Sequence, residues 1–87
     1  MTLNFPNQSR FYDMTRRAVR FWGNDSAMEA SFYVNEDALK RLHPGMQPDE
    51  ASMLEVFDLN RDLIRSTAAK VYHRGQRGSY DLIPSDF

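Results

Sequence analysis

The chain contains no cysteine, few glycines and prolines (four of each) and no long apolar run. Without cysteine neither a disulfide framework nor a thiolate zinc site can form, and small secreted domains usually depend on such cross-links. Their absence favours the cytoplasm. Polar and charged residues interrupt residues 1–20 throughout, so we expect neither a signal peptide nor a membrane span.

An excess of charge is also lacking, because eleven basic residues stand against twelve acidic ones and the net charge is −1. The distribution is uneven. Residues 1–23 carry +3 (four basic, one acidic), residues 24–60 carry −6 (two basic, eight acidic) and residues 61–87 carry +2 (five basic, three acidic). This balance excludes a general attraction to nucleic acid or anionic lipid, and only a local basic patch could supply one.

Apolar residues are plentiful, at 41 % of the chain, and eleven of the 87 residues are aromatic. This composition supports a packed core and argues against a disordered chain. A chain this short buries only about 60 % of its unfolded surface and cannot sustain two cores. We therefore expect a single globular domain spanning residues 1–87.

Strand patterns occupy both ends of the chain. Apolar and polar residues alternate over Arg17–Gly23 and Met28–Val34, and the turn-forming residues 23–26 lie between them, so a β-hairpin is predicted. Ser79–Ile83 alternates in the same way before Pro84 and is the last expected strand. A short edge strand is expected at Leu3–Phe5, whereas residues 9–15 show no clean period and are interpreted as a loop.

Two helices are expected between these strands. Asn35 is suited to cap a short helix, which should end near Leu42 because Pro44 follows. Residues 48–74 then carry one unbroken amphipathic pattern, which predicts a single helix of roughly 27 residues, about 40 Å long. The residues that we expect this helix to bury against the sheet are Met53, Phe57, Ile64, Ala68 and Val71.

The order strand, strand, strand, short helix, long helix, strand indicates an α+β fold of two layers. We expect an antiparallel sheet of three or four strands with both helices on one face. An asparagine, Asn60, lies within the apolar stripe of the long helix. We expect its amide to bond to a strand backbone or a loop, or to fix the register between paired helices. The overhang of so long a helix is compatible with a homodimer.

Characteristic strand and turn patterns extend over nearly the whole chain, at residues 3–7, 16–23, 31–34, 38–39 and 78–82. In these patterns the chain resembles a family of small bacterial proteins called domain of unknown function 1488. The resemblance implies a compact α+β protein of the bacterial cytoplasm. It supplies no reaction, ligand or functional residue.

The sequence contains no recognisable motif for catalysis or for binding a metal or a cofactor. His43 and His73 are the only histidines, which is too few for a zinc site in a chain without cysteine. No Gly-x-Ser-x-Gly elbow occurs, and the paired acids lie where a helix N-terminus favours them. These observations disfavour an enzyme, a metal site and a cofactor. Arg74 and Arg77, beside the glycines of residues 75–78, are a candidate anion contact.

The most suggestive group combines arginines with aromatic rings: Arg16, Arg17, Arg20, Trp22 and Tyr33. Strand alternation places Arg20, Trp22 and Tyr33 together, on the face away from Phe21 and Phe32. Three interpretations stay open. Trp22 packs under residues 11–14 while Arg20 pairs with Glu29 across the hairpin; or the group binds a protein partner or a second copy; or it binds single-stranded nucleic acid weakly.

Overall fold

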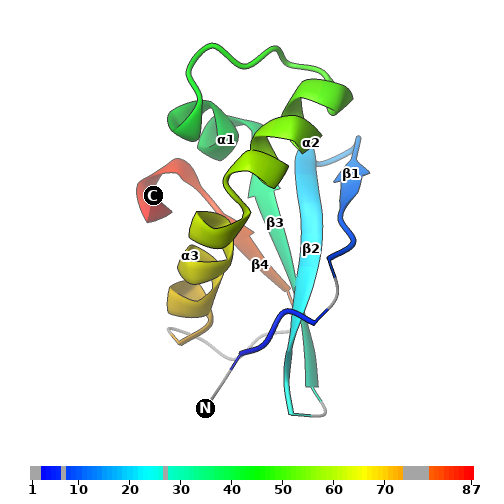
Figure 1. Ribbon diagram of the computed structural model, residues 1–87, viewed down its shortest axis with the longest axis vertical. Helices are drawn as coiled ribbons and strands as arrows, with labels where there is room; N and C mark the ends of the chain where they lie inside the picture. Colours follow the sequence, from blue (N-terminus) through cyan, green and yellow to red (C-terminus); the bar gives the residue numbers. More distant parts are fainter. Residues whose placement is uncertain (1–2, 7, 27, 74–78) are drawn as a thin grey trace.

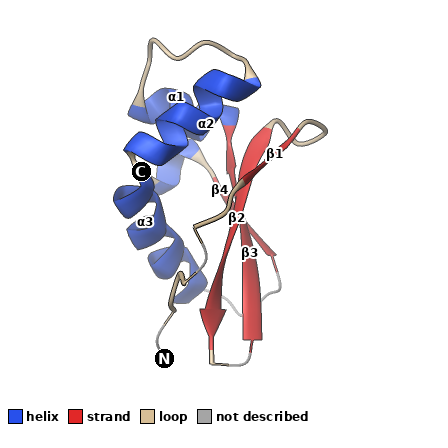
Figure 2. Ribbon diagram, turned by 45° about the vertical axis from the view of Figure 1, so that its right-hand side comes forward, coloured by secondary structure: helices blue, strands red, loops and turns tan. Residues whose placement is uncertain are grey.

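The computed structural model describes residues 3–6, 8–26, 28–73 and 79–87, and it confirms the α+β class. A twisted four-stranded sheet carries helices on one face only (Figure 1; Figure 2). The elements in chain order are β1 (Phe11–Asp13), β2 (Ala18–Asp25), β3 (Met28–Asn35), α1 (Glu36–Leu42), α2 (Glu50–Leu59), α3 (Arg61–His73), β4 (Ser79–Leu82) and the 3-10 helix η1 (Pro84–Asp86).

The strand order is β1-β2-β3-β4, and the sheet is mixed rather than wholly antiparallel. The first three strands pair antiparallel, whereas β4 runs parallel to β3, with Ser31 opposite Ser79 and Val34 opposite Leu82. The expectation of a purely antiparallel sheet is therefore wrong at its last strand. The reason is the long connection through three helices, which carries the chain back to the end of the sheet where β3 began.

The predicted hairpin is confirmed, but its turn lies later than expected. β2 continues through Asp25, and Gly23 is paired with Ala30 inside the sheet. Gly23 serves a close approach and not the turn: a Cβ there would lie 2.9 Å from both the Asn4 carbonyl oxygen and a ring carbon of Phe5. The left-handed conformation needed for the turn is supplied by Ser26, with φ 56°.

The N-terminal segment lies against the end of β2 that precedes the hairpin turn. The expected edge strand at Leu3–Phe5 is reduced to one bridge, in which Asn4 and Asn24 exchange backbone hydrogen bonds of 2.8 and 2.7 Å. The Phe5 ring packs 6.0 Å from Phe21 and 6.1 Å from Phe32. The expected loop at residues 9–15 is wrong, because it contains β1. Three residues are too few to show a period in the sequence.

The predicted long helix is two helices, broken at Asn60. Asn60 leaves the helical conformation (φ −117°, ψ 22°) and caps α2, and its side-chain Nδ2 donates to the Val56 carbonyl oxygen at 2.9 Å. The amide therefore bonds to the last turn of its own helix and not to a strand or loop. A side chain that satisfies a terminal carbonyl stabilises an end rather than a continuous helix. The bend is visible between α2 and α3 in Figure 1.

Helix starts follow the capping chemistry of the sequence. As predicted, the Asn35 Oδ1 accepts a 2.8 Å hydrogen bond from the Ala38 backbone N–H at the start of α1, which ends at Leu42. Asp49 caps α2 by accepting a 2.7 Å bond from the Ser52 N–H. Pro48 therefore lies before this helix and not in its first turn.

The core lies between the helices and the inner face of the sheet. Phe32 and Val34 of β3 are fully buried, as are four of the five residues expected from the helical stripe: Met53, Phe57, Ile64 and Ala68. Val71 is only partly buried, and Tyr72 takes the buried position instead. Tyr72 lies four residues after Ala68 and eight after Ile64, so it shares their face of α3. The Tyr72 hydroxyl donates to Asp25 Oδ2 at 2.8 Å and so joins α3 to β2.

Candidate interaction surface

None of the described helices covers the outer face of the sheet, because α1, α2 and α3 all lie on the opposite side (Figure 2). Along β2 and β3 the side chains alternate as the sequence predicts. Phe21 and Phe32 point into the core, whereas Arg20, Trp22 and Tyr33 are exposed or half-buried on the outer face. The outer face therefore presents aromatic and cationic side chains that are accessible to solvent.

Trp22 is covered on one side by Phe11 of β1. The two rings stack with centroids 5.6 Å apart and an angle of 8° between their planes. Phe11 itself is 58 % exposed. Trp22 thus packs against residues 11–14 as one interpretation held, but its cover is an exposed aromatic ring. The sequence analysis missed Phe11. Its neighbour Tyr12 packs toward the core, so strand alternation would have placed Phe11 on the outer face.

Two arginines lie over the aromatic rings of this face. The guanidinium carbon of Arg16 is 4.2 Å from the centre of the Tyr33 ring, and that of Arg20 is 5.5 Å from the centre of the Trp22 ring. These distances fit cation–π attraction. Arg20 Nη2 also donates to Ser31 Oγ at 3.3 Å. We name the set Phe11, Arg16, Arg20, Trp22 and Tyr33 the outer-face cluster.

The expected cross-strand pair between Arg20 and Glu29 does not form. The register places Arg20 opposite Tyr33 and Glu29 opposite Asn24. A turn at residues 23–26 would have aligned Arg20 with Glu29, but the turn lies later and shifts the pairing. The position of the turn thus decides which side chains meet across the hairpin.

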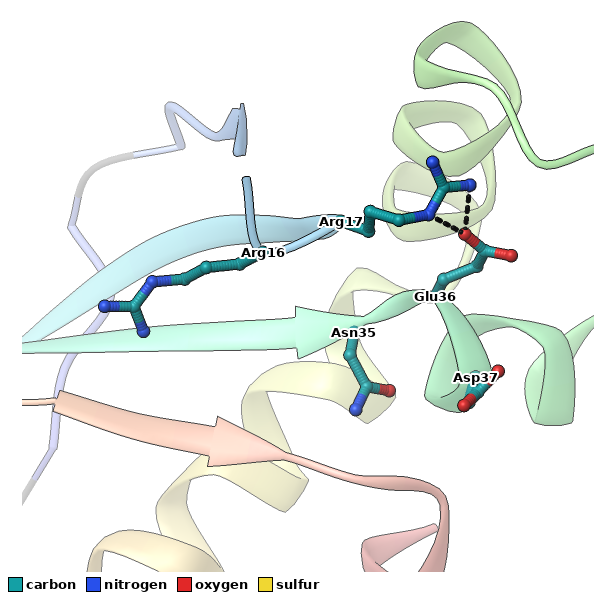
Figure 3. Close-up of a pocket in the computed structure, with 5 residues that line it drawn as sticks. All are labelled: Arg16, Arg17, Asn35, Glu36 and Asp37. Carbon is teal, nitrogen blue, oxygen red and sulfur yellow. Dashed lines mark hydrogen bonds and ion pairs between the residues drawn. The ribbon is translucent and has the colours of Figure 1, made fainter. Parts of the chain in front are cut away.

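Arg17 does not join the outer-face cluster. Figure 3 shows Arg16 and Arg17 diverging from adjacent positions, with Arg17 directed to Glu36 at the start of α1. Arg17 Nε donates to Glu36 Oε1 at 2.7 Å, and Lys40 Nζ lies 3.1 Å from Glu36 Oε2. The hydrogen bond from Lys40, followed by that from Arg17, lowers the pKa of Glu36 below its ordinary value. Arg17 has a left-handed backbone (φ 49°) at the end of the turn that precedes β2.

Between these arginines lies an open concavity of about 310 Å³, lined by Arg16, Arg17, Asn35, Glu36 and Asp37. Its central carboxylate, Glu36, is already held by Arg17 and Lys40. Asn35 is committed to capping α1. The concavity therefore has structural contacts but no free convergent donors for a ligand.

A second set of ion pairs fastens the N-terminal segment to the helices. Arg10 donates from Nε and Nη2 to the two carboxylate oxygens of Asp58, at 3.0 and 2.8 Å. Arg61 donates to Asp58 Oδ1 at 2.7 Å and to the Gln8 carbonyl oxygen at 2.9 Å. The hydrogen bond from Arg10 lowers the pKa of Asp58 below its ordinary value of 3.8. These contacts are structural and lie on the helical side of the molecule.

The remaining candidates of the sequence receive no support as sites. Arg74 and Arg77, the candidate anion contact, lie outside the described residues. His43 is exposed in the connection before α2. Within the part of the chain that the structure describes, no three residues among His, Asp and Glu are grouped so as to hold a metal ion. None of the described helices has the length and apolar character needed to cross a bilayer.

Comparison with known proteins assigns the family. The fold resembles the crystal structure of a protein of unknown function from the DUF1488 family of Shewanella loihica PV-4, with a TM-score of 0.80 and 19 % sequence identity. That match covers 92 % of this chain and 90 % of the other. No curated protein matches. The model of the family described as "Protein of unknown function (DUF1488)" matches residues 3–83, and the chain therefore belongs to the DUF1488 family.

Proposed function

We propose that this protein is a non-enzymatic interaction module of the cytoplasm that docks on another protein surface through the outer-face cluster. The observation that carries the proposal is the stacked pair of Phe11 and Trp22, accessible on a sheet face that no described helix covers and flanked by Arg16 and Arg20. The absence of cysteine suits a reducing compartment.

The chemistry of the cluster is that of a binding hot spot. Trp, Tyr and Arg are the residues most enriched where truncation costs the most binding energy. Ring stacking and the cation–π contacts also hold these side chains in place before a partner arrives. Less side-chain entropy is then lost on association, which favours binding.

Nucleic acid is the alternative, and the charges of the outer face disfavour it. Arg17, one of the three arginines that this alternative needs, is paired with Glu36. Asp13 lies 3.6 Å from Arg16, and Asp81 stands in register beside Tyr33. Exposed Glu29 lies on the same face of β3, so two arginines stand against three acidic residues and the face lacks the net positive charge that phosphate binding requires.

Photocrosslinking in living cells tests the proposal. A benzophenone amino acid at Phe11 should give one adduct of defined mass, because the position lies inside the interface. The same probe at Leu59, which is 76 % exposed on the helical side, is the matched control and should give none. The Phe11 adduct should disappear when Arg20→Asp is added, because that change reverses a charge of the cluster.

Two results would decide against this function. An adduct that nuclease removes would assign the face to nucleic acid. Equal crosslinking from Phe11 and Leu59, or none from either, would show that the outer face is not a specific interface.

A further inference from the structure

We infer that the partner of the outer face is a second copy of this chain, related by a twofold axis that runs parallel to β3 over Tyr33. The inference rests on the proposed function and names its partner. It follows from the order of side chains across the sheet, their charges and the pairing that each charge lacks.

One row of residues crosses all four strands. In register order it contains Phe11 of β1, Arg20 of β2, Tyr33 of β3 and Asp81 of β4. Residues in direct register project to the same face. The row therefore places one cation and one anion on either side of a central tyrosine, roughly 10 Å apart because neighbouring strands are about 4.8 Å apart.

The two charges at the flanks of Tyr33 have no ion-pair partner among the described residues. Arg10, Arg16 and Arg17 each have a carboxylate partner. Neither Arg20 nor Asp81 forms an ion pair with any described residue, and the one printed side-chain hydrogen bond of Arg20 goes to the neutral Ser31. Both are exposed.

A twofold rotation about an axis over Tyr33 matches these charges. The rotation exchanges the two sides of the row, so that β2 of one copy faces β4 of the other. Arg20 then meets Asp81 of the second copy, the reciprocal pair forms by symmetry, and the two Tyr33 positions meet at the axis. A surface that carries its own complement is what an isologous dimer requires.

The remaining charges of the face are Asp13, Arg16 and Glu29. Arg16 is near the axis but is balanced by Asp13 in its own copy. Glu29 is exposed on the same face of β3, so the face carries −1 in each copy. The two reciprocal contacts between Arg20 and Asp81 must therefore outweigh the repulsion between the two Glu29 side chains. An acidic partner of another kind would leave Asp81 facing a like charge.

Charge reversal with mixing tests the inference. Sedimentation velocity over a concentration series compares the wild type with Arg20→Asp and Asp81→Arg, after circular dichroism has shown that each variant folds. Each variant alone should dimerise about tenfold to a hundredfold more weakly, because like charges then meet twice in the dimer. An equimolar mixture of the two variants should recover wild-type association, because opposite charges face each other again at both positions.

The control pair places the same reversals on the helical side, as Lys70→Asp and Asp62→Arg, both exposed on α3. These variants should associate like the wild type. The inference fails if the wild type is monomeric throughout, if either outer-face variant dimerises normally, or if the mixture stays monomeric. A specific Phe11 adduct with a different protein would overturn this inference and keep the proposed function, whereas no Phe11 adduct would overturn both.

Discussion

The two faces of one sheet differ in what stabilises their side chains. On the inner face Phe32 is completely buried and stacks 5.3 Å from Phe21 and 5.3 Å from Tyr80. On the outer face its chain neighbour Tyr33 is half-buried and is covered by the Arg16 guanidinium. The inner aromatics are stabilised by removal from water, and the outer ones by ring and cation contacts that leave them accessible. Strand alternation thus separates the buried aromatic side chains of this sheet from the accessible ones.

Substitutions at two adjacent residues of β3 should show the largest difference in stability between the two faces. Phe32→Ala should lower the free energy of unfolding by about 3–5 kcal/mol, because it leaves a cavity among buried rings. Tyr33→Ala should cost only about 1 kcal/mol, the range of a cross-strand contact at a surface. Urea unfolding followed by circular dichroism measures both. Equal losses from the two variants would show that the outer face is also part of the core.

Gly23→Ala tests how tightly the inner face of the sheet packs against the N-terminal segment. The new methyl group would stand 2.9 Å from the Asn4 carbonyl oxygen, so the variant should lose about 1–3 kcal/mol. Hydrogen exchange should also show lost protection at the Asn24 amide, which bonds to Asn4. Gly45→Ala is the control, because the nearest atom to its Cβ, on His43, is 3.9 Å away. Unchanged exchange at Asn24 would contradict the tight contact.

Asn35 is the last residue of β3 and follows the alternation of the outer face, but its side chain has a structural role as the N-cap of α1. Asn35→Ala removes the N-cap of α1 and should cost about 1 kcal/mol in thermal or urea unfolding. Asn35→Asp keeps an oxygen acceptor for the Ala38 N–H and should restore most of that loss. A similar loss from both variants would mean that the cap is not the cause.

Acid unfolding gives the smallest expected effect. Arg10 lowers the pKa of Asp58, so this carboxylate adds stability that is complete above its ordinary pKa of 3.8 and is lost as the pH falls through the lowered value. Asp58→Asn should therefore destabilise the protein at neutral pH by no more than about 1 kcal/mol, because the pair is largely exposed. The difference from wild type should shrink below pH 3.8. Asp62→Asn, which removes no described ion pair, should show no such convergence.

The sequence predicted those elements whose causes are local. The hairpin follows from alternation, and α1 follows from a capping asparagine and a proline after its end. Strand alternation alone was enough to predict that Arg20, Trp22 and Tyr33 share one face. These features depend on neighbours within a few residues, which a single sequence displays.

The missed features depend on distant contacts. β1 is three residues long and exists because β2 pairs with it. Arg17 does not join the outer face and instead forms an ion pair with Glu36, 19 positions away. Asn60 was visible as a polar residue in an apolar stripe, but its meaning as a helix end depends on the sheet that α2 and α3 must follow.

The parallel strand β4 also sets the order in which the molecule can be completed. Ser79 pairs with Ser31 across a connection of three helices, so the last strand emerges from the ribosome long after its neighbour. Until then Phe32 lacks Tyr80 as a stacking partner, and the β3 edge of the hairpin has no strand paired with it. Nascent chains that stop before Leu82 should therefore present aromatic surface to chaperones, because β4 is the strand that covers Phe32 with Tyr80.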